Sequence, residues 1–558
     1  MIKNSIINSI LYPFLQLKFK EKIIFFLIIF FSLFLIFFDL LTLSILASVF
    51  FETDNMIIEN IDKILNLIYK KINITLNFFQ FKILIIVFSL IFRNVFYILL
   101  DYNIRSFVFK IYYISSKKIF NLYASSDLRK FNSKSIHHYI KNINKETWYC
   151  YVGILYGFLY LSVDLIYFFS LLFSLYYVVN IEFSSNLLLA IGSFFLLILI
   201  IFDRIKKLGK KRQGSETKYY RETLNILKSY LEIKVYNKIK YFTDNFAKHL
   251  KKFCEAHIFQ GVINLLPKAI IEILISITLL FYLIFNNEKL DLELFTLIGF
   301  VMFRLAPVIT RIIQNTNLII FYHPSSKILI NEEKFYLNKE KNKKVSFDVN
   351  SLSLKNISFS YSNQKIFKNF NYKFLKNNIY GIYGESGKGK TTLMMILAGL
   401  IDVNDGKFEI NNTDFTNKRI DWSKKIGMMS QYNIMIDDSL SQTLFMDEKY
   451  DKKLINLSKK YLIKLKLKKL IKYLNRKYDG SYSLQGMLSG GEKQRLSIVR
   501  TILLGGNILF LDEPTSSLDK TNEQVVMKEF QNLKKNRIII ISTHKKELMS
   551  QFDHIINL

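Results

Sequence analysis

The residues best suited to chemistry form a glycine-rich loop, 384–391, whose sequence GESGKGKT fits the pattern G-x-x-x-x-G-K-[ST]. An apolar, strand-like run precedes this loop, and a helical pattern follows it. Phosphate binding needs this context, because glycines let backbone N–H groups turn onto phosphates and a helix N-terminus adds its positive dipole end. We expect Lys390 to reach the β- and γ-phosphates of a nucleotide and the Thr391 hydroxyl to bind Mg²⁺. For the loop taken alone, the alternative is a glycine turn that precedes a helix by chance. The predicted phosphate-binding residues are Gly384, Glu385, Ser386, Gly387, Lys388, Gly389, Lys390, Thr391 and Thr392.

Three ionisable residues follow two later strand-like runs. Asp512 and Glu513 end an apolar run that starts at Ile508. In this arrangement Asp512 helps to hold Mg²⁺, and Glu513 polarises the attacking water. His544 follows the run 537–542, where it can hydrogen-bond a γ-phosphate. We therefore predict Glu513 and His544 as catalytic residues.

Two more candidate ligands also lie at strand ends. Gln431 follows the run 426–430 and is predicted to contact the metal ion and the nucleotide. Tyr361 ends an alternating run, where it could stack on an adenine ring, although most such tyrosines only pack. Because open α/β sheets bind ligands at the carboxyl ends of their strands, we expect the strand-end residues to share one site.

The composition excludes several function classes. The 558 residues include 77 basic and 45 acidic ones, a formal charge of +32. Lys, Asn, Ile, Phe and Tyr are enriched together, as an AT-biased genome produces, so we interpret the charge as a Lys-rich surface and predict no nucleic-acid partner. The two cysteines, Cys150 and Cys254, have no metal-ligand or C-x-x-C spacing.

The first part of the chain is built from long apolar stretches. Crossing a bilayer takes about 20 apolar residues. The loop 204–218 is rich in Lys and Arg, which places the N-terminus and the long loops in the cytoplasm. We predict a transmembrane domain over 1–330 with long cytoplasmic helical extensions, a linker over 331–344 and a nucleotide-binding domain over 345–558. The six predicted spans lie near 23–51, 82–100, 151–179, 187–203, 256–285 and 294–322.

Between the first two spans, the segment 55–72 has an amphipathic helical pattern. It is interpreted either as a helix on the outer membrane surface or as an ordinary packed loop helix.

Charged residues within the spans indicate function, since an ionisable group at membrane depth is costly and usually faces a cavity or a partner. Arg304 and Arg311 are seven residues apart and share a helix face. Two interpretations stay open. In the first, the basic side chains pair with the acidic residues of the spans or extend to the membrane–water interface. In the second, they form the basic wall of a cavity that binds an anionic head group. The charged residues are Asp39, Arg93, Asp164, Lys268, Glu272, Arg304 and Arg311.

The segment 488–495, LSGGEKQR, resembles the signature motif of the ABC transporter family. The resemblance covers essentially the whole chain and implies an α-helical six-span transmembrane domain of the exporter type, followed by an α/β P-loop nucleotide-binding domain. It implies an ATPase coupled to transport, with ATP and Mg²⁺ as cofactors. Tyr361 matches the adenine-stacking aromatic, Gln431 the Q-loop glutamine, 517–519 the D-loop and His544 the switch histidine.

The signature motif also implies a second copy of the chain. Ser489 and the amides of Gly490 and Gly491, at a helix N-terminus, can cap the γ-phosphate of ATP held by Lys390 of the other copy. A homodimer with two ATP sites is the expected assembly. Lys388 departs from the usual exporter pattern, as does Ser430, which stands where a proline is common.

The segments 266–272, 303–312 and 321–326 look like parts of spans five and six of PglK-type flippases. Those proteins move polyprenyl-pyrophosphate-linked oligosaccharides across bacterial inner membranes. The resemblance implies that four basic residues face the lipid pyrophosphate, which suits Arg geometry. The alternatives are an exporter of another lipid, a peptide or a drug, and an ATP-gated channel or regulatory membrane ATPase. The predicted substrate residues are Arg93, Lys268, Arg304 and Arg311.

Overall fold

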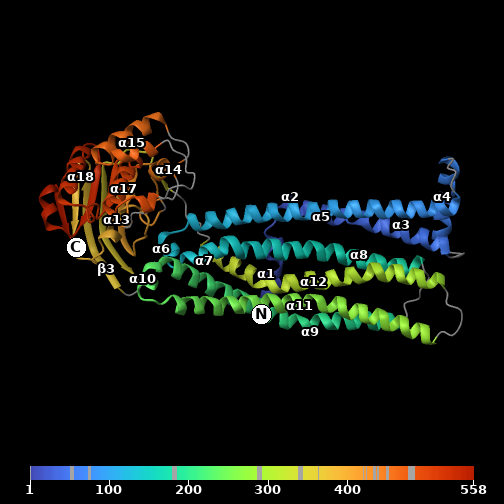
Figure 1. The fold of residues 1–558 in the computed structure, drawn as a ribbon. Coiled ribbons are helices and arrows are strands. Elements are labelled where there is room, and N and C mark those ends of the chain that lie inside the picture. Colours follow the sequence, from blue (N-terminus) through green and yellow to red (C-terminus); the bar gives the residue numbers. More distant parts are fainter. Residues whose placement is uncertain are drawn as a thin grey trace. The chain divides into compact units, whose positions relative to one another are not determined.

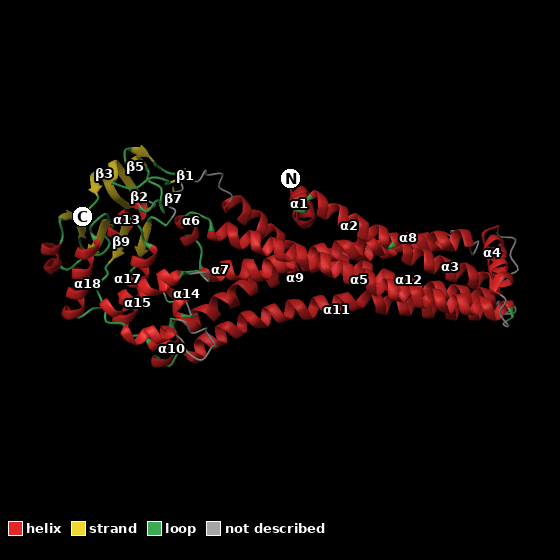
Figure 2. Cartoon of the chain, turned by 90° about the horizontal axis from the view of Figure 1, so that it is seen from above, coloured by secondary structure: helices red, strands yellow, loops and turns green. Residues whose placement is uncertain are grey.

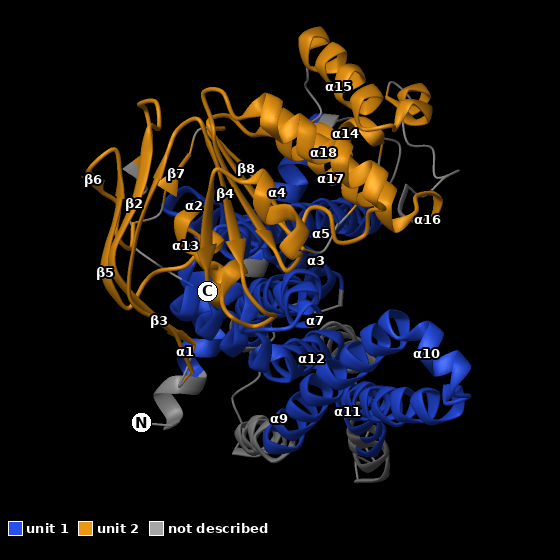
Figure 3. Ribbon diagram, turned by 90° about the vertical axis from the view of Figure 1, so that its left-hand side faces the viewer, with its two compact units in different colours: residues 1–126, 130–337 blue, residues 127–129, 338–558 orange. Residues whose placement is uncertain are grey.

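The computed structural model of the chain (Figure 1) contains two compact units, which Figure 3 colours separately. Unit 1 comprises residues 1–126 and 130–337, and unit 2 comprises residues 127–129 and 338–558. Side chains are not described for 1–6, 50–58, 72–76, 174–201, 271, 274–275, 278–304, 337–343, 362–363, 419, 423, 432–434, 436–438, 448–450 and 475–485. The structure describes the backbone of residues 2–50, 56–72, 77–178, 185–285, 292–336, 343–361, 364–418, 420–422, 424–431, 435, 439–447, 451–474 and 484–558.

Unit 1 is built from helices, which Figure 2 shows in red. Among the described residues, three helical stretches are long and apolar enough to cross a membrane: Phe19–Val49, Phe78–Ala124 and Ile136–Phe173. The helices are α1 (Ile2–Leu15), α2 (Phe19–Phe31), α3 (Leu33–Phe50), α4 (Met56–Ile72), α5 (Phe78–Ala124), α6 (Leu128–Asn132), α7 (Ile136–Lys141), η1 (Asn142–Glu146), η2 (Tyr149–Leu155), α8 (Tyr156–Val178), α9 (Ser185–Lys228), α10 (Tyr230–Val235), α11 (Ile239–Phe285) and α12 (Leu292–Tyr336).

The first predicted span is divided into two helices, α2 and α3, that meet at Ser32. The Ser32 hydroxyl donates to the carbonyl of Ile29 at 2.6 Å, so it competes with the helical backbone for an acceptor. The last three predicted spans lie on α9, α11 and α12.

The predicted amphipathic segment forms α4. The Lys82 ammonium of α5 pairs with Asp62 of α4 at 2.8 Å, and Leu65 is buried. Ile64 and Leu67 of α4 are exposed in the single chain. The placement of this apolar face on a membrane stays a prediction.

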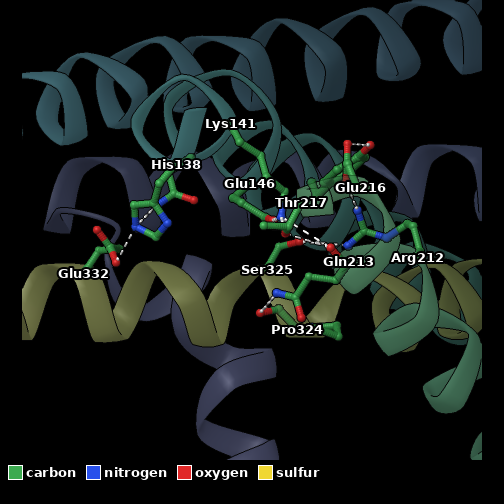
Figure 4. A network of polar contacts seen from close by, with 12 residues as sticks. His138, Lys141, Glu146, Arg212, Gln213, Glu216, Thr217, Pro324, Ser325 and Glu332 are labelled. Carbon is green, nitrogen blue, oxygen red and sulfur yellow. Dashed lines mark hydrogen bonds and ion pairs between the residues drawn. The ribbon is translucent and has the colours of Figure 1, made fainter. Parts of the chain in front are cut away.

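A network of buried charges joins η1, α9 and α12 (Figure 4). Arg212 is fully buried, pairs with Glu216 at 2.9 Å and donates to the Ser325 hydroxyl at 3.1 Å. Its guanidinium carbon lies 4.0 Å from the centre of the Tyr149 ring. A buried charge is costly unless it is paired, and here a carboxylate, a hydroxyl and an aromatic face surround the cation.

The segment that contributes Tyr149 departs from α-helical geometry. Both η1 and η2 are π-helical, between the α-helices α7 and α8. The Glu146 carboxylate of η1 pairs with the Lys141 ammonium of α7 at 2.6 Å, and both side chains are almost fully buried. Because π-helical turns inside α-helices are rare, this segment is a special feature of the membrane unit.

The described residues of unit 2 form three sheets. The largest is a parallel sheet of order β11-β4-β10-β9-β8, and an antiparallel sheet has the order β3-β2-β5-β6. The strands are β1 (Lys343–Lys344), β2 (Ser351–Tyr361), β3 (Gln364–Leu375), β4 (Asn378–Tyr383), β5 (Asp405–Ile410), β6 (Thr413–Asp414), β7 (Ile420–Asp421), β8 (Ile426–Met429), β9 (Ile508–Asp512), β10 (Ile538–Thr543) and β11 (His554–Asn557). The helices are α13 (Lys390–Leu397), α14 (Leu440–Phe445), α15 (Lys452–Lys464), η3 (Lys468–Tyr473), α16 (Leu484–Met487), α17 (Gly490–Leu504), α18 (Lys520–Leu533) and η4 (Lys546–Gln551).

The parallel sheet separates the two apolar cores of unit 2. Ile538 and Ile540 of β10 lie in the core that contains α13, whereas Ile539 and Ile541 lie in the core that contains α17 and α18. Since both faces are covered, β9 and β10 are buried along their whole length, and each begins with four consecutive apolar residues. Parallel pairing of β4, β8, β9 and β10 brings their carboxyl ends to one edge.

The predicted linker starts too early. The helix α12 continues to Tyr336, so residues 331–336 are helical. Glu332 accepts a hydrogen bond from the Tyr123 hydroxyl at 2.8 Å, and Glu333 pairs with Lys118 at 2.6 Å. Glu332 and Glu333 are therefore partners of buried or half-buried groups in unit 1 and belong to its last helix.

Candidate nucleotide-binding site

The phosphate loop connects β4 to α13, as predicted. Gly387 and Gly389 have φ angles of 85° and 97°, in the left-handed region that favours glycine. A Cβ atom at Gly389 would lie 2.4 Å from the Ile366 side chain. The Lys390 ammonium donates to the carbonyls of Gly384 at 2.8 Å and Glu385 at 3.0 Å, so it lies against the loop backbone.

Two predicted magnesium ligands meet at the start of α13. The Thr391 hydroxyl donates to Asp512 Oδ2 at 2.5 Å, which joins α13 to the end of β9. A hydroxyl and a carboxylate are hard oxygen donors of the kind that Mg²⁺ prefers. These two residues therefore fit a magnesium ion bound beside the phosphate loop.

The two predicted catalytic residues are neighbours. The Glu513 carboxylate lies 3.5 Å from His544 Nδ1 and accepts a hydrogen bond from the Gln431 amide at 3.3 Å. Glu513 has a φ of 50°, which is uncommon for a residue other than glycine and marks a constrained backbone. Residues from the ends of β8, β9 and β10 thus converge, which is the arrangement that the strand-end pattern predicted. Their catalytic roles stay predictions.

The signature segment starts α17. Ser489 Oγ accepts from the Glu492 amide at 3.3 Å, and the Glu492 carboxylate accepts from the Ser489 amide at 3.0 Å, so the two form a capping box. A hydrogen bond from Lys469, together with those from Ser489, lowers the pKa of Glu492 despite its partial desolvation. Ser489 and Gly490 are exposed. The N-terminus of α17 is therefore accessible to a ligand. The predicted contact with ATP held by a second copy of the chain requires this accessibility.

Tyr361 ends β2 with its side chain 41% exposed. Its ring contacts Phe359 edge-to-face at 4.9 Å, and the exposed part of the ring is free to stack on a base. Adenine stacking at Tyr361 stays a prediction.

Two residues for which sequence reasoning predicted no role hold the site together. The Gln494 amide donates to the Glu513 carbonyl at 2.9 Å and to the Ser516 hydroxyl at 3.0 Å, and it accepts from the Ser517 amide at 2.9 Å. The Ser542 hydroxyl contacts both Asp512 and Glu513. A signal for Ser542 existed, because it is a polar residue that directly follows four isoleucines in a buried strand.

The predicted substrate residues in unit 1 are not all together. Arg93 pairs with Asp39 at 3.3 Å and Arg311 pairs with Asp164 at 2.8 Å. Both arginines line one small cavity of about 20 Å³, together with Tyr97, Asp101, Tyr160, Asp164 and Tyr167.

The other two residues are placed differently. The Lys268 ammonium lies 3.8 Å from Glu272 of the same helix, and the Lys268 side chain is 64% exposed. Lys268 does not line the cavity of the two arginines. The Arg304 side chain lies outside the described residues.

Residues 367–516 match the family model described as ABC transporter. The chain is 32% identical over 225 residues to the phosphonates import ATP-binding protein PhnC of Fusobacterium nucleatum, which covers 36% of this chain and 85% of that protein. The chain belongs to the ABC transporter family. ATP with Mg²⁺ is the usual cofactor of this family's ATP-binding domain, which confirms the two predicted cofactors.

Two further relatives match less completely. The chain is 29% identical over 387 residues to the multidrug resistance-like ATP-binding protein MdlA of Buchnera aphidicola, over 63% of this chain and 64% of that protein. It is 31% identical over 209 residues to the ATP-dependent lipid A-core flippase of Desulfotalea psychrophila, over 37% and 36%. The chain thus spans less than two thirds of the length of these curated relatives.

The solved structure of a bacterial Atm1-family ABC exporter with ATP bound resembles the whole fold. The TM-score is 0.73 at 16% identity, over 94% of this chain and 92% of that one. This match confirms the predicted fold class, a helical transmembrane domain of the exporter type followed by a P-loop ATPase domain. ABC exporters are multi-pass membrane ATPases coupled to transport, with the ATPase domain in the cytoplasm.

Proposed function

We propose that this ABC transporter uses ATP hydrolysis to flip an anionic lipid-linked oligosaccharide, a polyprenyl-pyrophosphate glycan, across a bacterial inner membrane. The observation that carries the ATP-driven step is the convergence of Thr391, Asp512, Glu513 and His544 at one sheet edge. An exporter-type membrane domain on the same chain supports coupling of that step to transport.

At the ATP site, each group has one task. Thr391 and Asp512 would hold Mg²⁺, which would neutralise phosphate charge when bound. Glu513 orients the attacking water and accepts its proton, while His544 donates a hydrogen bond to the γ-phosphate. Because Gln431 donates a hydrogen bond to Glu513, a movement of Gln431 at the end of β8 would shift the carboxylate that orients water.

A second copy of the chain completes each site in this proposal. The exposed Ser489 and Gly490 at the α17 N-terminus are suited to cap ATP on the other copy. Helix α10 and the residues after it expose Leu231, Val235 and Tyr236 by 70–71%. These exposed apolar side chains support contact with a partner, for which a homodimer is the simplest choice.

The cavity that Arg93 and Arg311 line supports an anionic cargo, because guanidinium groups bind phosphate oxygens in a bidentate manner. In the described structure Asp39 and Asp164 pair with these arginines. A pyrophosphate would have to displace the carboxylates or add to the pairs. This pairing also favours the second candidate, an exporter of a less charged lipid or a drug. The names of the relatives include both a lipid A-core flippase and a multidrug resistance-like protein.

Reconstitution in proteoliposomes tests the proposal. We expect a polyprenyl-pyrophosphate oligosaccharide to stimulate ATP hydrolysis and to be flipped in the presence of ATP, and not in a Glu513→Gln variant. ATP hydrolysis without stimulation or flipping by this lipid would reject the cargo and leave the second candidate. Absence of ATP hydrolysis in the wild-type protein would reject the transport mechanism as a whole.

A further inference from the structure

The strand β10 ends in two residues with buried hydroxyls, Ser542 and Thr543. Ser542 follows the isoleucine run 538–541, and its side chain is fully buried. In the parallel sheet Ser542 is in register with Asp512 of β9 on one side and with Ile382 of β4 on the other. It therefore lies between the strand that ends in the phosphate loop and the strand that ends in the two acids.

Ser542 makes two hydrogen bonds with the neighbouring strand. Its hydroxyl donates to Asp512 Oδ1 at 2.5 Å, and its oxygen accepts from the Glu513 backbone amide at 2.9 Å. The other Asp512 oxygen, Oδ2, accepts from Thr391. One serine thus contacts the carboxylate that is suited to hold Mg²⁺ and the backbone of the residue that is suited to orient water.

The bond to Asp512 determines how that carboxylate is rotated. With Oδ1 held by Ser542, the oxygen Oδ2 is directed at Thr391, where the magnesium ion fits. Asp512 is almost fully buried, so loss of the Ser542 hydroxyl would leave Oδ1 without this donor in a site that water does not reach freely.

The bond to Glu513 supports an uncommon backbone conformation. At a φ of 50° Glu513 is in the left-handed region, which costs free energy for a residue with a side chain. Ser542 holds the amide of this residue, and Gln494 holds its carbonyl at 2.9 Å. Together they fix the direction in which the Glu513 carboxylate leaves the strand.

We propose that Ser542 is a positioning residue of the ATP site, which sets the Asp512 carboxylate for Mg²⁺ and the Glu513 backbone for catalysis through one hydroxyl. The inference rests on the proposed ATP hydrolysis and goes beyond it, because it assigns a role to a residue outside the sequence motifs. Ser542 touches neither nucleotide nor water in this role.

The main test is the variant Ser542→Ala in the full-length protein. Hydrogen bonds to charged groups contribute more than neutral ones, so we expect the Mg²⁺ concentration for half-maximal binding to rise about tenfold. This is measured by Mn²⁺ titration of the ATP-loaded protein with electron paramagnetic resonance, in which Mn²⁺ replaces Mg²⁺. We also expect kcat for ATP hydrolysis to fall at least about tenfold at saturating Mg²⁺, because Glu513 loses its backbone support. ATP binding without a divalent ion should stay the same, since the phosphate loop and Lys390 are intact.

Two further variants separate positioning from folding. Ser542→Thr keeps the hydroxyl and should restore most of the Mn²⁺ affinity and of kcat. Ser458→Ala removes a fully buried serine of the same unit, whose hydroxyl bonds only to its own helix in the described structure, at Ile455. Because this neutral bond within one helix contributes less than the bonds of Ser542, the control should lower the melting temperature less than Ser542→Ala, with Mn²⁺ affinity and kcat unchanged.

The inference is overturned if Ser542→Ala binds Mn²⁺ and hydrolyses ATP like the wild-type protein. It is also overturned if the folded Ser542→Thr variant is as defective as Ser542→Ala, because the hydroxyl would then not be the group that matters. If the wild-type protein itself hydrolyses no ATP, the proposed function fails instead, and the Mn²⁺ titration still reports on the Asp512 carboxylate.

Discussion

Thr391 Oγ1 lies 2.5 Å from Asp512 Oδ2, although the two residues are 121 positions apart in the chain. The contact joins the first turn of α13 to the end of β9, so both groups are in place before a metal ion binds. Preorganised ligands lower the cost of binding, and a rigid sheet edge keeps their geometry. The chemistry of this ABC transporter is therefore built into the junction between two elements that the parallel sheet brings together.

The first prediction concerns Glu513. Replacement by glutamine keeps the size and the contact with Gln431 but removes the carboxylate that orients water. We expect ATP hydrolysis to fall by a factor of about 100 or more, the range for loss of a general base, while ATP affinity is retained. Hydrolysis of radiolabelled ATP and binding of a fluorescent ATP analogue measure the two effects. Wild-type turnover in this variant would exclude Glu513 from catalysis.

The second prediction concerns Gly389. An alanine there would combine a φ of 97° with a contact of 2.4 Å to Ile366, so the loop has to deform. We expect Gly389→Ala to weaken ATP binding at least about tenfold, because the left-handed conformation alone costs 1 to 2 kcal/mol. Gly214→Ala in α9 is the control, since no atom lies within 4 Å of the added Cβ, and it should bind ATP normally. Equal affinity in the two variants would show that the loop tolerates a side chain.

The nucleotide site was largely predictable because its residues lie within short motifs at the ends of apolar runs. Asp512 and Glu513 follow a run of four apolar residues. A short run of apolar residues is the sequence pattern expected of a buried parallel strand. Ser542 was missed because its role depends on register: only the pairing of β9 with β10 places it opposite Asp512. Register between strands far apart in the sequence is not encoded in either strand alone.

The membrane unit was less predictable in detail. Hydropathy located the apolar segments, but it is insensitive to one hydrogen bond, such as the Ser32 contact between α2 and α3. Hydropathy also gave no reason to extend α12 through Glu332. The hydrogen-bond partners of Glu332 are His138 and Tyr123, which lie about two hundred positions away in the chain. For the same reason the sequence left open whether Arg93 pairs with an acid, and the structure provides Asp39 as the partner.

The third prediction concerns the arginines of the cavity. Arg93→Ala and Arg311→Ala should each impair lipid flipping more than basal ATP hydrolysis if the guanidinium groups bind the cargo. Asp39→Asn and Asp164→Asn free the arginines from their partners, so transport should be kept or increased in these variants. Flipping and hydrolysis are measured in the same proteoliposomes. If the asparagine variants lose transport as fully as the alanine variants, the pairs are structural and an anionic cargo loses its support.

The fourth prediction concerns the buried pair of Arg212 and Glu216. Burial raises the pKa of Glu216 above its ordinary value, and Glu146 raises it further, while Arg212, Lys141 and a hydrogen bond from Tyr149 oppose this shift. Removal of one partner of a buried pair costs about 3 to 5 kcal/mol, because it leaves an uncompensated charge. Arg212→Met should therefore strongly lower the melting temperature at neutral pH, measured by tryptophan fluorescence in detergent.

The pH dependence of that variant tests the cause. Without Arg212 the pKa of Glu216 in the folded protein rises further above its unfolded value, so folding favours the protonated acid. The stabilising effect of protonation is complete at pH values below the unfolded pKa and is lost as the pH rises through the folded one. Arg212→Met should consequently recover part of its lost stability at pH 5 relative to pH 8. The double variant Arg212→Met with Glu216→Gln should be more stable than Arg212→Met at pH 8 and should lack this pH dependence. A single variant whose stability loss is the same at both pH values would show that packing against Tyr149, rather than the unpaired carboxylate, determines the cost.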